Sequence, residues 1–137
     1  VGDSTIVGFR IPYEREWELV ADNKKKNQIW ASLDDSQIIG ARDSLPTELN
    51  INSNQYGVFE IYGSLWEWTY DGYQSYPMDE VKFFVGINES RKVLRGGSWR
   101  ETDPAYFSSS NRLPQAPNDG NVTTGMRLVL QNYPQAP

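Results

Sequence analysis

The sequence of 137 residues contains no cysteine and no histidine. These two absences exclude disulfides, thiolate nucleophiles, zinc–cysteine sites, haem ligation by histidine and Ser-His-Asp triads. Any bound metal would therefore be a hard cation, calcium or magnesium, held by oxygen ligands. The lack of cysteine leaves the compartment open, because reducing and oxidising locations both tolerate it.

Positive charge is also scarce: 13 Lys and Arg stand against 18 Asp and Glu, for a net charge of −5. We expect no nucleic-acid partner, because phosphates require a basic face. The run Lys24–Lys26 is short and typical of a solvated loop. No apolar run approaches the roughly 20 residues of a membrane span, and no signal peptide is evident, so we expect no membrane insertion. Because the chain begins with Val1 rather than methionine, we expect that an upstream segment or tag has been removed.

Aromatic residues are abundant, with 5 Trp, 8 Tyr and 5 Phe. A chain of this length can bury a core without disulfides. We therefore expect one domain over residues 1–131, followed by a Pro-rich tail at 132–137.

One helix is predicted with its start and its end. Pro12 suits the first turn, and Glu14 and Glu16 follow where the helix dipole favours negative charge. One apolar stripe at helical spacing continues the pattern to about Ala21; its members are Tyr13, Trp17 and Val20.

The remaining elements are short. The stretch Asp22–Asn54 is rich in Asn, Asp, Ser and Gly and is predicted to be ordered loop. Tyr56–Tyr62 is apolar and Leu65–Tyr70 is aromatic. Strands are predicted from β-branched or alternating content at Thr5–Phe9, Gln37–Ala41, Lys92–Arg95 and Gly125–Leu130, with a polar strand at Ala105–Asn111. This mixture indicates the α+β class.

Four sequence blocks occur in a characteristic order. They read FRIPYEREWE at 9–18, YGVFEIYGSLWEWT at 56–69, VLRGGSW at 93–99 and GMRL at 125–128. Together they resemble the formylglycine-generating-enzyme (sulfatase-modifying factor) superfamily, whose blocks are R-L-P-T-E-x-E-W-E, G-L-x-D-M-x-G-N-x-W-E-W, R-G-G-S-W and G-F-R. The resemblance extends from Phe9 to Leu130. It implies a C-type-lectin-like fold: a small twisted antiparallel sheet, one main helix and long ordered loops. Because only Val1–Gly8 precedes the first block, the chain is either a minimal version of the fold or has lost an upstream part.

Most block residues are expected to serve the scaffold. The glycines Gly96 and Gly97 would permit a bend that a Cβ blocks. Arg95 and Arg127 would tie loops to the sheet through carboxylates or carbonyls. The tryptophans are expected to pack in the core with their indole N–H groups bonded to backbone; they are Trp17, Trp66, Trp68 and Trp99.

The resemblance implies no catalysis. Formylglycine-generating enzymes hold copper through two cysteines, and ungapped alignment places those positions on Glu101 and Tyr106, which lack the sulfur that Cu(I) requires. Related sulfoxide synthases take iron from histidines of a separate domain, and this chain has none. We therefore expect no copper, iron or zinc. A carboxylate catalyst built from Glu101 and Asp103 stays open as an alternative.

The resemblance also implies a structural calcium site in the second block. Its ligands would be the Glu60 and Glu67 carboxylates and the Gly63 and Leu65 carbonyls, because calcium takes six to eight oxygens. In the alternative interpretation Glu67 accepts from a backbone N–H and Glu60 is simply exposed. The Glu-Pro-Asn, Gln-Pro-Asp and Trp-Asn-Asp signatures of sugar-binding lectins do not occur.

The segment Arg100–Thr124 is expected to form the exposed face on which the enzymes of this family bind substrate. More than half of it is Ser, Thr, Asn, Asp, Tyr or Phe, and such residues combine rigid aromatic area with adaptable hydrogen bonding. The residues expected to contact a ligand are Arg100, Glu101, Asp103, Tyr106, Phe107, Ser108, Ser110, Asn111, Asn118, Asp119, Asn121 and Thr123.

A second branch of the superfamily sharpens this hypothesis. The segment is similar to the variable proteins of diversity-generating retroelements, in which adenine-directed mutagenesis rewrites exposed codons; ordinary solvated loops have a similar composition. The favoured function is a non-catalytic receptor-binding domain of a phage, virus or cell-surface protein, with a protein or other macromolecular ligand. The alternatives are an enzyme homologue without its copper cysteines and a structural module of a larger surface assembly. Host, ligand and oligomeric state stay open.

Overall fold

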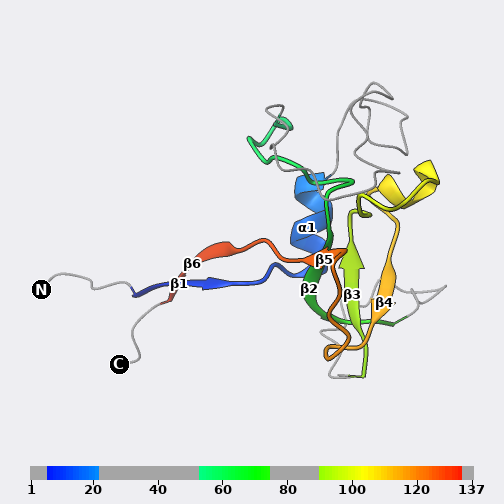
Figure 1. Cartoon of the computed structure of the whole chain (residues 1–137). Helices are drawn as coiled ribbons and strands as arrows, with labels where there is room; N and C mark the ends of the chain where they lie inside the picture. The colour runs from blue at the N-terminus through cyan, green and yellow to red at the C-terminus, as the bar shows by residue number, and fades with distance from the viewer. Residues whose placement is uncertain (1–5, 22–52, 75–89, 134–137) are drawn as a thin grey trace, which may run out of the picture.

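The computed structural model describes residues 6–21, 53–74 and 90–133 (Figure 1). The α+β class is confirmed, while the strand expected at Gln37–Ala41 lies outside the described residues. In chain order the elements are β1 (Ile6–Arg10), α1 (Glu14–Ala21), β2 (Trp66–Gly72), β3 (Lys92–Arg95), the 3-10 helix η2 (Pro104–Phe107), β4 (Leu113–Gln115), β5 (Thr124–Gly125) and β6 (Val129–Tyr133).

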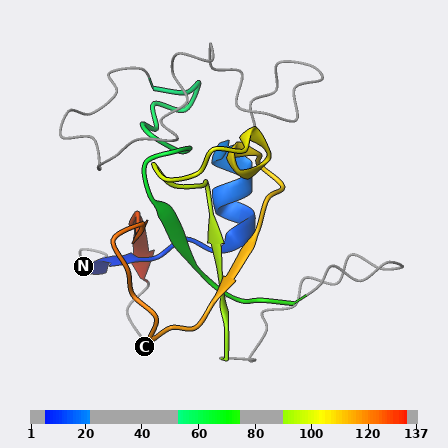
Figure 2. The same ribbon diagram turned by 45° about the vertical axis from the view of Figure 1, so that its right-hand side comes forward.

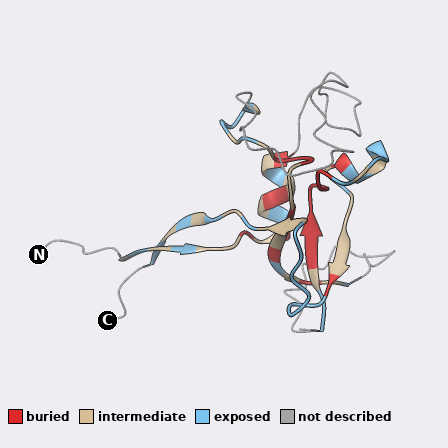
Figure 3. Cartoon of the chain, in the orientation of Figure 1, coloured by how far each residue is buried: buried red, intermediate tan, exposed pale blue. Residues whose placement is uncertain are grey.

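The central sheet has the strand order β4-β3-β2-β5. β3 is antiparallel to both β2 and β4, whereas β5 is parallel to β2, with Trp66 opposite Thr124 and Glu67 opposite Gly125. The expected small antiparallel sheet is therefore present, with one parallel pair added at its β5 edge. Helix α1 packs against β2 and β3, and buried residues gather on α1, on β3 and in the turn that follows β3 (Figure 3).

The predicted helix is confirmed. Glu16 accepts a hydrogen bond of 2.8 Å from the backbone N–H of Tyr13, which satisfies one of the free donors at the helix start. Trp17 and Ala21 face the core. The Trp17 ring meets Tyr62 edge to face at 5.8 Å between centroids, and Ile61 and Phe107 complete this cluster.

The bend after β3 requires its two glycines, as the sequence predicts. Gly96 and Gly97 have φ of 96° and 74°, in the left-handed region that side chains disfavour. A Cβ on Gly96 would lie 2.8 Å from the Ile61 carbonyl oxygen, and one on Gly97 would lie 2.8 Å from the Phe107 ring. The bend thereby brings the backbone directly against the core.

The segment after this bend contains the 3-10 helix η2, so the strand predicted at Ala105–Asn111 is wrong. The Asp103 side chain accepts a hydrogen bond of 2.9 Å from the Ala105 N–H. Pro104 follows at the first helical position, where its fixed φ is favourable. An aspartate cap and a proline thus start a helical turn where the polar alternation alone suggested extended chain.

β1 and β6 form a separate two-stranded antiparallel ribbon that projects away from the central sheet (Figure 1). The single strand predicted at Gly125–Leu130 is wrong, because β5 ends at Gly125 and β6 begins at Val129. β6 also continues through Tyr133 and overlaps the start of the expected tail. No helix in the described part of the chain has the length and apolar character needed to cross a bilayer.

Candidate ligand-binding face

Three loop segments converge at the end of the central sheet where β3 ends and β2 begins. The Trp99 N–H donates to the Ser64 carbonyl at 3.0 Å, and the Trp66 N–H donates to the Thr123 carbonyl at 2.9 Å. Backbone hydrogen bonds therefore hold the turn after β3, the loop before β2 and the approach to β5 against one another.

Trp66 organises the centre of this region. It is 2% exposed, and its indole N–H donates to Glu101 Oε1 at 2.9 Å. The Ser98 hydroxyl lies 3.3 Å from the same oxygen. The Tyr106 ring meets the Trp66 ring edge to face at 5.9 Å. Glu101 and Tyr106, the two positions that the family resemblance leads us to expect at the copper cysteines, thus both contact one buried indole.

The Trp99 ring lies against the exposed side chain of Arg100. Its indole N–H donates to the Val122 carbonyl at 3.4 Å. The Arg100 guanidinium lies 4.7 Å from the centre of the Trp99 ring, with its outer side in solvent. We call the resulting surface the Trp66 face; it consists of Trp66, Trp99, Arg100, Glu101, Tyr106 and Thr123.

The predicted contact residues differ in exposure. The exposed ones are Arg100, Asp103, Tyr106, Ser110, Asn118, Asp119 and Asn121, and the partly exposed ones are Glu101, Asn111 and Thr123. The other two, Phe107 and Ser108, are only 2% and 4% exposed, so the prediction that they contact a ligand is wrong. Phe107 belongs to the core cluster, and the Ser108 hydroxyl lies 2.7 Å from that of Ser110.

The exposed residues do not form one patch, because β4 divides the segment. Gln115, at the end of β4, pairs with Lys92 at the start of β3, and its side chain donates to the Asp119 carbonyl. Asn118 and Asp119 therefore lie at the end of the sheet opposite to η2 (Figure 2). Asn121 lies closer to the Trp66 face, since its Oδ1 accepts the Thr123 N–H at 2.8 Å.

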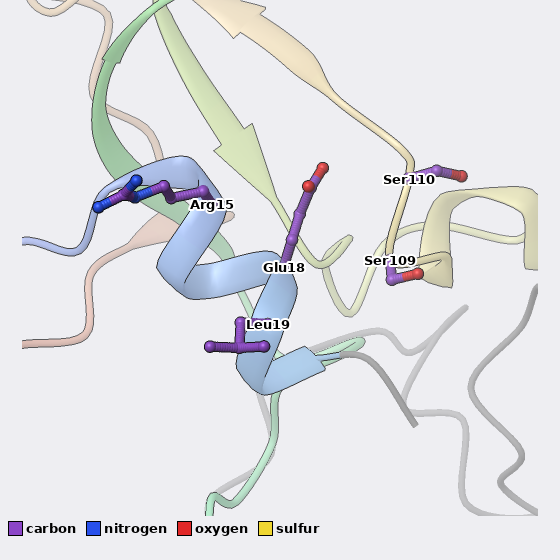
Figure 4. A pocket seen from close by; sticks show the side chains of 5 residues that line it. All are labelled: Arg15, Glu18, Leu19, Ser109 and Ser110. Carbon is purple, nitrogen blue, oxygen red and sulfur yellow. The ribbon is translucent and has the colours of Figure 1, made fainter. Parts of the chain in front are cut away.

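A shallow pocket of about 370 Å³ lies between α1 and the loop after η2 (Figure 4). Glu18 extends toward the loop, and its carboxylate pairs with the fully buried Arg95, which also donates to the Ser109 carbonyl. The lining residues are Arg15, Glu18, Leu19, Ser109 and Ser110. The sequence predicted only Ser110, because the outer face of an amphipathic helix has the pattern of ordinary solvent surface.

The four residues expected to bind calcium do not present a suitable donor set. Glu67 Oε2 accepts from Trp17 Nε1 and from Arg127 Nε, both at 2.7 Å, and Oε1 accepts from the same guanidinium. A carboxylate already neutralised by arginine does not fit calcium. In the alternative interpretation Glu67 accepts a hydrogen bond from a backbone N–H. Among the described residues its donors are the side chains of Trp17 and Arg127 instead.

Of the other expected ligands, Gly63 donates its N–H to the Gly96 carbonyl at 3.0 Å, and Glu60 lies in the left-handed region with φ of 49°. No three Asp or Glu side chains gather into a possible metal site among the residues that the structure describes.

One charge pair lies beside this region, at the junction of ribbon and helix. Arg10 donates two hydrogen bonds of 2.7 Å to Glu16. These bonds, helped by the Tyr13 N–H, lower the pKa of Glu16, and the same pairing raises the pKa of Arg10. The pair fixes the start of α1 relative to β1.

The chain is similar to known proteins in sequence and in fold. Inactive C-alpha-formylglycine-generating enzyme 2 of Bos taurus is 29% identical over 89% of this chain and 44% of its own length. Hercynine oxygenase of Mycolicibacterium smegmatis is 27% identical over 89% of this chain and 33% of its own. The solved structure of Treponema denticola variable protein 1 superposes with a TM-score of 0.72 and 26% identity, over 88% of this chain and 47% of that one.

This structural likeness confirms the C-type-lectin-like fold. The chain spans less than half the length of each of these relatives. The family model described as Sulfatase-modifying factor enzyme 1-like domain matches residues 4–132. The chain therefore belongs to the FGE-sulfatase family.

Proposed function

We propose that this chain is a non-catalytic binding domain whose Trp66 face contacts a protein or other macromolecular ligand. One observation carries the proposal. Glu101 and Tyr106 stand at the positions aligned with the copper cysteines, and Trp66 holds both of them as parts of the surface. The side chains of these positions stabilise a recognition surface, whereas Cu(I) would need thiolates there.

A carboxylate catalyst is less well supported. Glu101 Oε1 already accepts hydrogen bonds from Trp66 and Ser98, and the Asp103 side chain caps η2. Two of the relatives are named inactive enzyme and variable protein, while a third is named an oxygenase. The family alone therefore does not decide the activity, and the side chains of the site support the proposal.

The exposed chemistry suits macromolecular recognition. Arg100 lies over the Trp99 ring, and Tyr106, whose ring contacts Trp66, is 36% exposed. Tyrosine and arginine supply much of the binding energy at protein interfaces. Asn121 and Thr123 add short side chains that can hydrogen-bond. Such a domain would serve at the receptor-binding end of a phage, virus or cell-surface protein.

We further propose that the exposed positions of Arg100–Thr124 are diversified between copies of the coding region. The test is to sequence the locus and its relatives, searching for a reverse transcriptase and a near-identical template copy. We expect differences at Arg100, Tyr106 and Ser110, and none at the buried Phe107 and Ser108. A locus without a template copy, or substitutions spread equally over buried positions, would refute the diversification.

The non-catalytic character has its own test. The chain is incubated with copper, oxygen and a cysteine-containing peptide, and oxygen consumption is recorded. We expect no turnover above that of free copper, and the same result for Glu101→Gln. Turnover by the native chain that Glu101→Gln abolishes would establish an enzyme and overturn the proposal.

A further inference from the structure

The β1–β6 ribbon exposes the face that a sheet normally buries. Cross-strand partners project to the same side of an antiparallel pair. Val7 lies opposite Asn132, and Phe9 lies opposite Leu130. The three apolar side chains of this face are 55%, 70% and 59% exposed for Val7, Phe9 and Leu130, respectively. Leu128, at the next alternate position before Leu130, is 56% exposed.

The opposite face of the ribbon is mixed, with Arg10 and Gln131 beside the apolar Ile6, Val129 and Tyr133. The Arg10 guanidinium donates to the Gln131 side chain and pairs with Glu16. The Tyr133 ring lies against Gly8, so closely that a Cβ on Gly8 would lie 2.9 Å from a ring carbon. The charged group of this face is therefore bonded within the chain, whereas Val7, Phe9 and Leu130 on the other face lie in water.

Within the described residues the backbone of the ribbon lies close to no other helix or strand, and its side-chain contact with α1 is the Arg10–Glu16 ion pair. A two-stranded sheet alone is marginally stable in water, because one layer cannot bury its apolar side chains. Contiguous exposed apolar patches of this kind mark interaction surfaces. Among the described residues nothing covers the Val7–Phe9–Leu130 face.

We propose that the covering partner is a second copy of this chain, with the two ribbons packed face to face about a two-fold axis. A two-fold interface needs a patch that is complementary to itself. The face has this property, because its four side chains bear no charge; they are Val7, Phe9, Leu130 and Asn132. Two acidic copies can therefore meet there without bringing like charges together. The same apolar side chains on both ribbons then pack into one layer.

The expected area agrees with a weak but specific dimer. Covering the four exposed apolar side chains and their surroundings in both copies buries roughly 800–1,000 Å² in total, below the standard size of stable interfaces and in the range of weak, transient ones. We therefore expect a weak dimer, because an interface of this size has little surplus over the cost of association.

The test is analytical ultracentrifugation of the full chain over about 5 μM to 1 mM, with two matched lysine variants. Leu130 is 59% exposed on the ribbon face, whereas Leu19 is 63% exposed on α1. We expect the native chain and Leu19→Lys to dimerise alike, and Leu130→Lys to weaken the dimer at least tenfold. Circular dichroism verifies that both variants keep the fold, and Val7→Lys repeats the test at a second position of the face.

Hydrogen exchange supplies a second measurement. We expect the amides of β1 and β6 to become more protected as the protein concentration rises, while those of β3 stay unchanged. A native chain that is monomeric over the whole range overturns the proposal, whatever other protein binds the ribbon. So does a dimer that Leu19→Lys weakens as much as Leu130→Lys, because that dimer would use another face.

Discussion

The indole N–H of Trp66 donates a 2.9 Å hydrogen bond to the carboxylate of Glu101. Trp66 belongs to the second of the four sequence blocks, and Glu101 is one of the two positions that the family resemblance leads us to expect at the copper cysteines. A buried residue of a sequence block thus binds the side chain at one of these positions. The hydrogen bond makes Glu101 part of the framework of the surface.

This contact predicts that Glu101 stabilises the fold. Replacing Glu101 with alanine leaves the 2% exposed Trp66 indole N–H without its acceptor, so we expect a loss of about 1–3 kcal/mol in the free energy of unfolding. The measurement is urea denaturation followed by tryptophan fluorescence. Thr102→Ala, at the exposed next position, serves as control. Equal stability of Glu101→Ala and the native chain would contradict the role of this hydrogen bond.

From the ion pair between Glu67 and Arg127 we predict that Glu67 stabilises the fold whether or not calcium is present. Glu67→Gln weakens the pairing with Arg127 and leaves that guanidinium without its counter-ion, so we expect a loss of about 2–4 kcal/mol. The melting temperature of the native chain should be the same in calcium and in EDTA. A rise in melting temperature with calcium that Glu67→Gln abolishes would restore the calcium site expected from the family.

The Arg10–Glu16 pair predicts a dependence of stability on pH. The pKa of Glu16 in the folded chain is below its ordinary value of 4.5, so the pair stabilises the fold above that value and loses its effect as the pH falls through the folded pKa. We expect Glu16→Gln to cost about 0.5–1 kcal/mol at pH 7, because the pair is partly exposed and screened by solvent. In urea titrations the difference from the native chain should disappear as the pH falls through the folded pKa of Glu16.

A control separates this effect from general acid destabilisation. Asp119→Asn removes an exposed carboxylate that forms no ion pair among the described residues, and it is measured over the same pH range as the matched control. A Glu16→Gln difference that persists below the folded pKa would show that the glutamate acts through packing and not through charge.

Tyr106 and Phe107 are neighbours in sequence with opposite roles. Phe107 is 2% exposed and Tyr106 is 36% exposed. We expect Phe107→Ala to cost about 3–5 kcal/mol, because it empties a core position. Tyr106→Ala should cost about 1 kcal/mol, the contribution of one edge-to-face contact. Guanidinium denaturation of both variants checks the contrast, and similar losses would mean that Tyr106 also belongs to the core.

The sequence predicts best those features that depend on local spacing. The helix from Glu14, the strand Lys92–Arg95 and the glycine bend lie where the pattern places them. The ties made by Arg95 and Arg127 are confirmed as well. The helix, the strand and the bend follow from neighbouring residues, because capping, alternation and φ preferences act over a few positions, whereas the arginine ties join distant residues and were expected only in kind.

Features that depend on contacts between distant residues could not be predicted from local sequence patterns. Trp17 and Trp66 donate to the carboxylates Glu67 and Glu101 and not to backbone, and only long-range folding brings these groups together. For the same reason the polar composition of the segment after the bend did not reveal which of its side chains point inward. Burial of Phe107 depends on the approach of Gly97, which no local pattern encodes.

The buried Arg95 binds the loop after η2 through the carbonyl oxygens of Ser109 and Asn111. A carbonyl oxygen belongs to the main chain and is the same for every residue type. The anchoring is therefore indifferent to the identity of the side chains at these two positions. A loop held by its main chain can exchange its surface chemistry without a compensating change in the framework beneath it.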